Sequence, residues 1–297
     1  MTTFTDFKTE FLPIIDASLD EALSLPLKDD RDELCQAMRH SLLNGGKRIR
    51  PLLSLASHAL FSKHYASILP LCSAIEMVHT YSLIHDDLPA MDNDDFRRGK
   101  PTCHKQFGDA MAILAGDNLH TLAFELLSTQ LSSFKSAQVL RAIQSFSSLI
   151  GMDGLIGGQV LDIKSDTTHQ DLAHLKQIHE KKTGALIQFS VMAPAILEDQ
   201  SEDIIQSLKQ FGYHLGLLFQ ITDDILDVTG DVASLGKSPN KDQDMNKLTY
   251  VNLLGLDQAK KEAQLESEKS QACLASLSTM ETDLLSDIIS VELHRTS

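Results

Sequence analysis

The stretch IEMVHTYSLIHDDLPAMDNDDFRR, residues 75–98, joins an apolar run to a cluster of five aspartates. The apolar residues before the cluster recur at helical spacing, as they do on a helix of a protein core. Pro89 then disfavours helix at Leu88, so we expect the chain to leave the helix and Asp92 to return towards Asp86. The cluster therefore begins at the end of a core helix, where unpaired burial of these charges would be costly.

A second acidic segment, FQITDDILD at residues 219–227, also follows an apolar helix. Asp223 and Asp227 are four residues apart and so share one face of that helix. One such segment is ordinarily a solvated acidic surface. Two of them, each at the end of a core helix, favour a hard cation such as Mg²⁺, which takes oxygen ligands and is often shared with substrate phosphates. EF-hand spacing is absent, which disfavours a Ca²⁺ sensor.

Basic residues flank both acidic segments and point to phosphate ligands. The stretch GGKRIRP at 45–51 places cations beside a flexible glycine pair, where backbone N–H groups can face an anion. Other basic residues near the acidic segments are Arg97, Arg98, Lys181, Lys182, Lys237, Lys241 and Lys247. Neither a Walker loop nor a dinucleotide-binding fingerprint is present.

The rest of the chain repeats the helical pattern. Helices are expected at Phe4–Leu19, at Asp30–Asn44 with a stop at Gly45-Gly46, from Pro51 to about Phe61, at 67–88, 109–132, 136–150 and 201–228, after Lys181–Gly184, and from 256 onwards. No alternating strand pattern of useful length and no linker occurs. With 15 Gly, 8 Pro and only 5% aromatic residues, the chain is predicted to be one all-α domain, residues 1–297.

Composition restricts the class of protein further. The 26 basic and 41 acidic residues give a net charge of −15, which makes nucleic acid an unfavourable partner. A hydrophobic fraction of 42% excludes disorder and a fibrous fold. The four widely spaced cysteines form no CxxC pair and favour reduced thiols. With no signal peptide and no apolar stretch of membrane-spanning length in view, we expect a soluble cytoplasmic protein.

Taken together, these motifs resemble the trans-isoprenyl diphosphate synthases. The motifs that carry the resemblance, in family order, are Asp86-Asp87-x4-Asp92 with Arg97-Arg98, Gly158-Gln159, Lys182-Thr183, and Gln220-x2-Asp223-Asp224-x2-Asp227. The likeness extends from Gly45 to about Leu254 and is strongest to the bacterial-type farnesyl diphosphate synthases. The two extra residues of their first motif are Pro89-Ala90 here, an insertion that plant-type geranylgeranyl diphosphate synthases share.

The resemblance implies an antiparallel helix bundle around a deep cavity, usually a homodimer, with about three Mg²⁺ ions that hold an allylic diphosphate. The implied metal ligands are Asp86, Asp92 and Asp223, supported by Asp87, Asp224 and Asp227. The implied allylic-diphosphate ligands are Arg97, Lys182, Thr183, Gln220, Lys237 and Lys247, although the family's Gly-Lys-Ser/Thr-Thr reads Asn246-Lys247-Leu248-Thr249 here. The implied isopentenyl diphosphate ligands are Gly46, Lys47, Arg50, His79 and Arg98. Lys182, Thr183 and Gln220 would also be catalytic, the last two through oxygen dipoles that stabilise an allylic cation.

The activity that the resemblance implies is condensation of isopentenyl diphosphate with dimethylallyl and geranyl diphosphate. In similar enzymes the product tail grows past the residues five and four before the first aspartate, here Tyr81 and Ser82. Five helical residues span about 7.5 Å, so a bulky ring at Tyr81 favours a C15 product, unless Tyr81 merely packs between helices. His85 is interpreted as structural or supporting.

Other functions are weighed against this one. A geranylgeranyl diphosphate synthase is the main alternative within the class of enzyme. A class I terpene cyclase needs no isopentenyl diphosphate site, and a non-catalytic partner subunit typically loses an aspartate motif. A function as a divalent-cation buffer does not account for the basic residues that flank the acidic segments.

Overall fold

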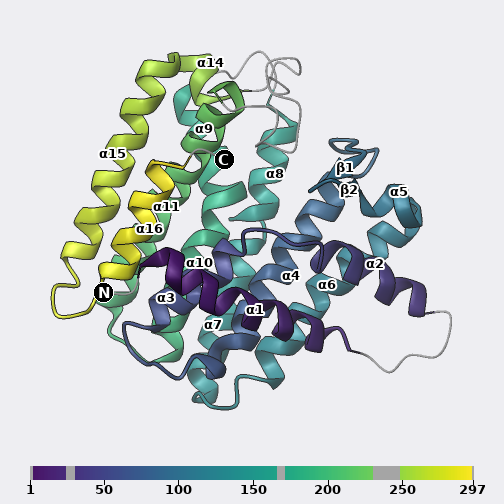
Figure 1. Cartoon of the computed structure of the whole chain (residues 1–297), viewed down its shortest axis with the longest axis horizontal. Coiled ribbons are helices and arrows are strands. Elements are labelled where there is room, and N and C mark those ends of the chain that lie inside the picture. Colours follow the sequence, from purple (N-terminus) through teal and green to yellow (C-terminus); the bar gives the residue numbers. More distant parts are fainter. Residues whose placement is uncertain (1–2, 25–30, 166–170, 230–247, 296–297) are drawn as a thin grey trace.

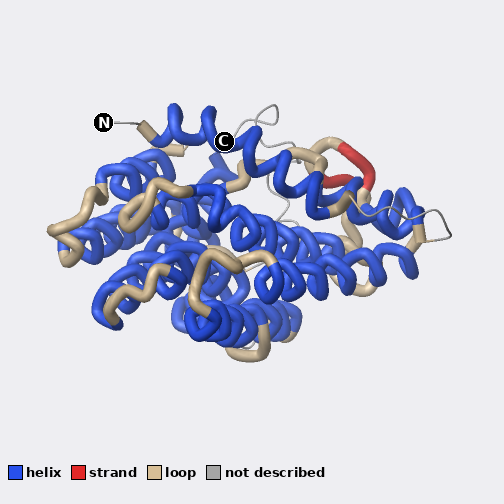
Figure 2. The backbone as a smooth tube through the Cα atoms, turned by 90° about the horizontal axis from the view of Figure 1, so that it is seen from below, coloured by secondary structure: helices blue, strands red, loops and turns tan. Residues whose placement is uncertain are grey.

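The computed structural model describes residues 3–24, 31–165, 171–229 and 248–295. Helices make up 77% of the structure and strands 2%, which confirms the all-α prediction (Figure 2). The first half contains α1 (Phe4–Ala22), α2 (Asp32–Leu42), α3 (Ile49–His58), η1 (Tyr65–Ile68), α4 (Leu69–Asp86), β1 (Phe96–Arg97), β2 (Lys100–Pro101), α5 (Cys103–Phe107) and α6 (Asp109–Thr129). The second half contains α7 (Ser136–Ile150), α8 (Leu155–Ile163), α9 (Leu172–His179), the π-helical turn η2 (Glu180–Gly184), α10 (Ala185–Leu197), α11 (Glu202–Thr229), α14 (Tyr250–Leu254), α15 (Leu256–Ala275) and α16 (Asp283–Leu293).

Local sequence signals explain where several helices begin and end. Thr3 and Asp6 form a reciprocal capping box at the start of α1. Gly45 and Gly46 have φ of 66° and 123°, so the chain turns after α2 in a conformation that favours glycine. Pro51 lies in the first turn of α3, where its missing N–H costs no helical hydrogen bond. The helix expected at 136–150 is α7 with those bounds.

Helix α4 lies in the interior of the bundle and leads to the first acidic segment. The segment Tyr65–Asp86 reaches membrane-spanning length and apolarity, which the sequence analysis did not anticipate. Because 67% of its apolar window is buried inside the protein, the role of α4 as a core helix accounts for this apolarity.

Helix α10 is buried along its whole length and packs against α3 and α11. Pro194 has no N–H to donate to the carbonyl of Ser190, one turn earlier. Ser54 of α3 donates its hydroxyl to that carbonyl at 2.8 Å, and Ser57 donates to the carbonyl of Val191 at 2.6 Å. The two serines thus satisfy buried acceptors and join α3 to α10.

Glycines allow α8, η2 and α11 to approach one another closely. A Cβ built on Gly158 of α8 would lie 2.2 Å from the backbone nitrogen of Lys182. A Cβ on Gly216 of α11 would lie 2.8 Å from the Cα of Gly184. The backbone of η2 is therefore held between two helices, and this close packing fixes the position of Lys182 and Thr183.

The bundle places helices that are distant in the sequence side by side. Helices α11, α15 and α16 pack side by side, and the β1–β2 hairpin lies across the molecule from α15, next to α5 (Figure 1). The hairpin, α5, α8, α9 and α14 were not predicted, because each is too short to show a clear period.

Candidate active site

The first acidic segment turns back on itself, as the position of Pro89 led us to expect. The backbone N–H of Asp92 donates to the carbonyl of Asp86 at 2.8 Å. The Asp86 carboxylate accepts a 2.7 Å hydrogen bond from Gln159 and lies 3.9 Å from the Lys182 ammonium. Burial raises the pKa of Asp86 to about 6; Lys182 opposes this shift and Asp92 adds to it. Asp86 therefore lies in a partly desolvated position facing α8 and η2.

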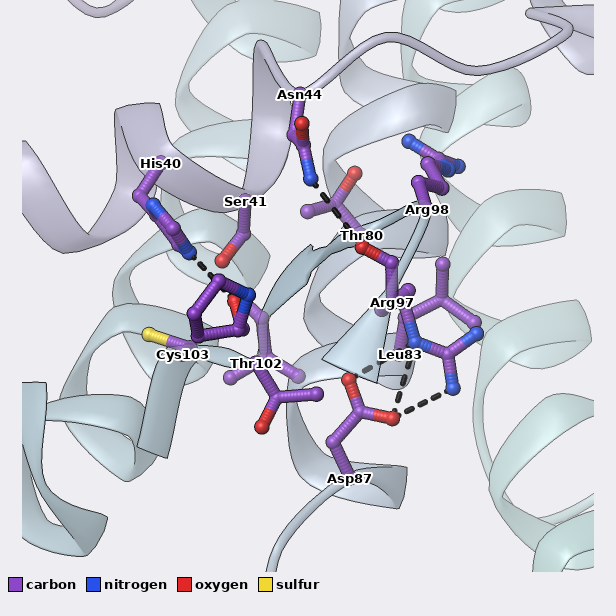
Figure 3. A pocket seen from close by; sticks show the side chains of 12 residues that line it. His40, Ser41, Asn44, Thr80, Leu83, Asp87, Arg97, Arg98, Thr102 and Cys103 are labelled. Carbon is purple, nitrogen blue, oxygen red and sulfur yellow. Dashed lines mark hydrogen bonds and ion pairs between the residues drawn. The ribbon is translucent and has the colours of Figure 1, made fainter. Parts of the chain in front are cut away.

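Asp87 and Arg97 form an ion pair beneath the hairpin (Figure 3). The Arg97 Nε donates to both Asp87 oxygens, at 2.8 and 3.0 Å, and Nη2 donates at 2.5 Å. Burial alone would lower the pKa of the Arg97 guanidinium, but Asp87 raises it overall. A small cavity of about 30 Å³ lies beside this pair. Arg98 points away from Arg97, so the neighbouring arginines have different surroundings (Figure 3).

The second acidic segment presents its aspartates on different faces of α11. Asp223 is exposed and pairs with Arg295, just beyond α16. Asp227, one turn later, is half-buried on the same face. Asp224 is buried, and its Oδ2 accepts a 2.7 Å hydrogen bond from the backbone N–H of Tyr250. The contact seen for Asp224 thus attaches α14 to α11, and its metal-supporting role stays a prediction.

A cavity of about 860 Å³ opens between α3, α4, η2 and α11. Its lining includes every residue predicted to bind isopentenyl diphosphate: Gly46, Lys47, Arg50, His79 and Arg98. Arg97, Thr183, Gln220 and Asp223 also line it. Residues far apart in the sequence, such as Gly46 and Asp223 at 177 positions, therefore meet at one site.

The cavity carries an excess of positive charge. Burial lowers the pKa of Arg50, whose Nε has no hydrogen-bond partner although it is buried. Burial, followed by the charges of Arg50 and Arg98, holds the pKa of His79 well below its ordinary value. Burial also lowers the pKa of Lys47, and Arg295 adds to this effect. An anion would relieve this repulsion, so the cavity is suited to a phosphate group.

The residues of η2 contact α8 and α11 from either side of the turn. The Lys182 ammonium donates to Asp162 of α8 at 2.7 Å. The Thr183 hydroxyl donates to Gln220 Oε1 of α11 at 2.5 Å. A π-helical turn inside an α-helix often marks a functional site, and here it directs two neighbouring side chains towards different helices.

The structure places the chain-length candidates inside the helical packing. Tyr81 is 8% exposed and Ser82 is half-buried, its hydroxyl donating to the carbonyl of His79 at 2.8 Å. Neither lines the large cavity. Lys237 and Lys247 lie outside the described residues, as does Lys241.

Sequence reasoning missed Asp162 and Arg295, and it quoted Gln159 within a motif without giving this residue a role in the site. Gln159 and Asp162 are three residues apart on α8 and contact Asp86 and Lys182. That spacing was the available signal, but the helix was too short to predict. Nothing near Arg295 in the sequence indicated that it would belong to the site. Arg48, quoted with the glycine pair, is buried and pairs with Glu76 at 2.8 Å, and both residues belong to the lining of the cavity.

The donors fit a hard cation. The two acidic segments offer carboxylate oxygens, the hard donors that Mg²⁺ takes. Within the described ranges, no three His, Cys, Asp or Glu side chains converge on one point. The protein ligands therefore suit an ion such as Mg²⁺ that takes further oxygens from substrate phosphates.

Comparison with known proteins identifies the class. The family model of the polyprenyl synthetases matches residues 31–280, and the chain belongs to this family. It is accordingly a prenyltransferase. The chain is 42% identical over 287 residues to a farnesyl diphosphate synthase of Bacillus subtilis, covering 96% of this chain and 97% of the relative.

Two further relatives show the range of products in the family. A chloroplastic heterodimeric geranylgeranyl pyrophosphate synthase large subunit of Arabidopsis thaliana is 46% identical over 258 residues, covering 84% of this chain and 68% of the relative. The crystal structure of an FPP/GFPP synthase from Zymomonas mobilis superposes with a TM-score of 0.86 at 38% identity, covering 98% of both chains.

Proposed function

We propose that the chain is a Mg²⁺-dependent farnesyl diphosphate synthase. It condenses isopentenyl diphosphate with dimethylallyl diphosphate and then with geranyl diphosphate, in 1′–4 head-to-tail fashion, to give (2E,6E)-farnesyl diphosphate. The observation that carries the proposal is the cavity of about 860 Å³, which brings the cations of 45–51 and of the hairpin next to Asp223. Farnesyl diphosphate synthases among the relatives support the C15 product.

Each condensation forms one carbon–carbon bond and releases one diphosphate. The C–O bond of the allylic substrate breaks, and its electron pair leaves with the diphosphate. The double bond of isopentenyl diphosphate then attacks the allylic carbon. A proton leaves the adjacent carbon of the isopentenyl unit, and the departing diphosphate accepts it. The protein therefore needs no side-chain general base.

The cationic residues of the cavity bind and orient isopentenyl diphosphate. Lys47, Arg50 and Arg98 all line the cavity, so the repulsion among these charges is overcome during folding and not when the substrate binds. His79 stays neutral because of burial and of the nearby arginines, and its ring can donate one N–H to a phosphate oxygen. Asp86, Asp92 and Asp223 would hold Mg²⁺, which would supply positive charge to neutralise the departing diphosphate.

In this proposal Thr183 and Gln220, which both line the cavity, would direct oxygen dipoles at the reacting carbon. Their 2.5 Å hydrogen bond fixes both side chains across the gap between η2 and α11. These dipoles stabilise positive charge without a permanent negative charge that would attack it. The same cavity is also lined by the apolar side chains of Leu83, Ile187 and Phe219. These side chains exclude water, which would otherwise trap the cation.

We expect the purified chain to give a C15 product from either dimethylallyl or geranyl diphosphate when Mg²⁺ and isopentenyl diphosphate are present. Product chain length is measured by chromatography and mass spectrometry after the diphosphate is removed, with the chain left out as the control. A C20 product would contradict the farnesyl assignment and favour the geranylgeranyl alternative, which the Arabidopsis relative represents. Absence of condensation, under conditions in which a known synthase is active, would favour a non-catalytic partner subunit.

We also propose a cytoplasmic homodimer. All four cysteines are free, which suits a reducing compartment. Large apolar side chains are exposed on the consecutive helices α6, α7 and α8 and on the approach to α8: Ile113, Leu114, Leu140, Met152, Ile156, Val160 and Ile163. We call this set the apolar face. We propose that a second copy of the chain covers these side chains, because a large exposed apolar patch marks an interaction site.

Light scattering tests the dimer. We expect twice the 32.8 kDa chain mass for the wild type and the single mass for a variant in which Ile113 and Leu114 are both lysine. Ile14→Lys is the matched control, because Ile14 is a similarly exposed side chain on α1, outside the apolar face. A wild type of 32.8 kDa at assay concentration would contradict the homodimer.

A further inference from the structure

A column of aromatic rings begins at Tyr81 and crosses the bundle. Tyr81 of α4 packs edge-on against His120 of α6, with the ring centroids 5.0 Å apart. The column continues through neighbouring rings with centroid separations of 5.4, 5.4 and 4.7 Å, in the order His120, Phe124, Phe146 and Phe189. Its members belong to α4, α6, α7 and α10, and both Phe146 and Phe189 are fully buried. Tyr81 therefore rests on a packed support that extends across four helices.

Helices α4 and α6 are paired so that Tyr81 contacts one histidine ring on each helix. Tyr81 meets His120, and His85, one turn later on α4, lies over Gly116, one turn earlier on α6. This pairing is that of antiparallel helices, in which residues four apart share a face. A Cβ on Gly116 would lie 2.2 Å from His85 Nε2, so the glycine provides the space for that ring.

His85 is the second ring in contact with Tyr81. Its ring contacts Tyr81 edge-on with centroids 5.6 Å apart, and its Nε2 lies 3.1 Å from the carbonyl oxygen of Ile113. The Tyr81 ring thus contacts two histidines, one held by the α6 backbone and the other by the aromatic column. An edge-on arrangement is the favourable geometry for such rings.

These contacts matter because an aromatic ring limits a growing chain only if it cannot rotate aside. Tyr81 precedes Asp86 by five residues, about 7.5 Å of helix, and does not line the large cavity, so under the proposed function a product tail would meet its ring only after extending beyond that cavity along α4. A cavity left beside the ring would allow another rotamer, since protein interiors otherwise hold side chains by close packing. His120 fills the space on the α6 side.

We infer that His120 is a specificity-determining positioning residue: it holds the Tyr81 ring in place and thereby fixes the product chain length. The inference rests on the proposed function, because it specifies how the same site ends elongation. His120 acts through Tyr81 and has no direct part in the transfer step.

The test compares the products of six proteins made from geranyl and isopentenyl diphosphate with Mg²⁺: the wild type, Tyr81→Ala, His120→Ala, His120→Phe, the Tyr81→Ala/His120→Ala double variant and Thr121→Ala. We expect the ratio of C20 to C15 product to rise about tenfold or more in His120→Ala, within the range of steric discrimination between apolar groups. His120→Phe keeps a ring against Tyr81 and retains the C15 product. Thr121→Ala changes an exposed neighbour on α6 and is the matched control.

The double variant distinguishes a His120 that positions Tyr81 from a His120 that itself blocks the growing product. Because His120 acts through Tyr81, the double variant is expected to give the product distribution of Tyr81→Ala alone. If His120→Ala does not fold, His120→Val is used in its place.

The possible failures are distinguishable. A His120→Ala enzyme that keeps the wild-type C15 product, while Tyr81→Ala makes C20, overturns the inference. A Tyr81→Ala enzyme that keeps C15 overturns it as well, because elongation would then end elsewhere. A wild type that makes no condensation product contradicts the proposed function itself.

Discussion

Replacing Asp86 by asparagine is expected to lower the turnover number by about a thousandfold, comparable with the loss of a strong electrostatic contact in other active sites. The change keeps the shape of the side chain and an oxygen that can accept the Gln159 hydrogen bond. It removes the negative charge that would bind Mg²⁺ together with the substrate diphosphate. Asp223→Ala is expected to have a similar effect, because it removes an exposed carboxylate of the second acidic segment.

The measurement is a steady-state assay over a series of Mg²⁺ concentrations, with the chelated enzyme as the zero point. Asp95→Asn is the matched control. Asp95 belongs to the same acidic cluster, but it is exposed and pairs with Lys105 at 2.8 Å. Near-wild-type turnover and Mg²⁺ dependence in Asp86→Asn or Asp223→Ala would contradict the assignment of these residues as metal ligands.

The Gly158→Ala substitution is expected to destabilise the protein by about 1–3 kcal/mol, the range for overpacking a close contact. The added Cβ would lie 2.2 Å from the backbone nitrogen of Lys182, so α8 and η2 must separate. That separation would displace both Lys182 from Asp162 and Gln159 from Asp86. We therefore expect turnover to fall by about a hundredfold, in line with misplacement of groups near the reaction.

Helix propensity alone predicts the opposite sign, since alanine in a helix interior is favoured over glycine by about 1 kcal/mol. Denaturant unfolding followed by circular dichroism, together with turnover, distinguishes the two effects. Lys164→Ala, an exposed change at the end of α8, is the matched control. A Gly158→Ala protein more stable than the wild type would show that α8 and η2 separate without cost.

Much of the helical framework could be predicted because its signals are local. The bounds of α7 followed from apolar spacing, and the turn after α2 followed from Gly45-Gly46. The return of Asp92 to Asp86 followed from the restriction that Pro89 places on the preceding residue. In each case the deciding residues lie within a few positions of the feature that they determine.

The short elements were less predictable. Helix α8 contains two glycines in nine residues and exposes several apolar side chains, so neither its composition nor its spacing resembled a typical surface helix. The π-helical turn η2 has no sequence signature that separates it from the α-helix which follows. Both are stabilised by contact with neighbouring segments, as the close approach of Gly158 to Lys182 shows.

The sequence by itself determined the all-α class, the two acidic segments at the ends of core helices, and the basic residues that flank them. These features depend on spacing along the chain, which a single sequence displays. The tertiary structure decided which partner each charged side chain has. It paired Asp223 with Arg295, 72 residues away, turned Asp224 towards Tyr250, and placed Asp162 on Lys182. Such contacts depend on how helices distant in sequence pack together, and local spacing carries no information about that packing.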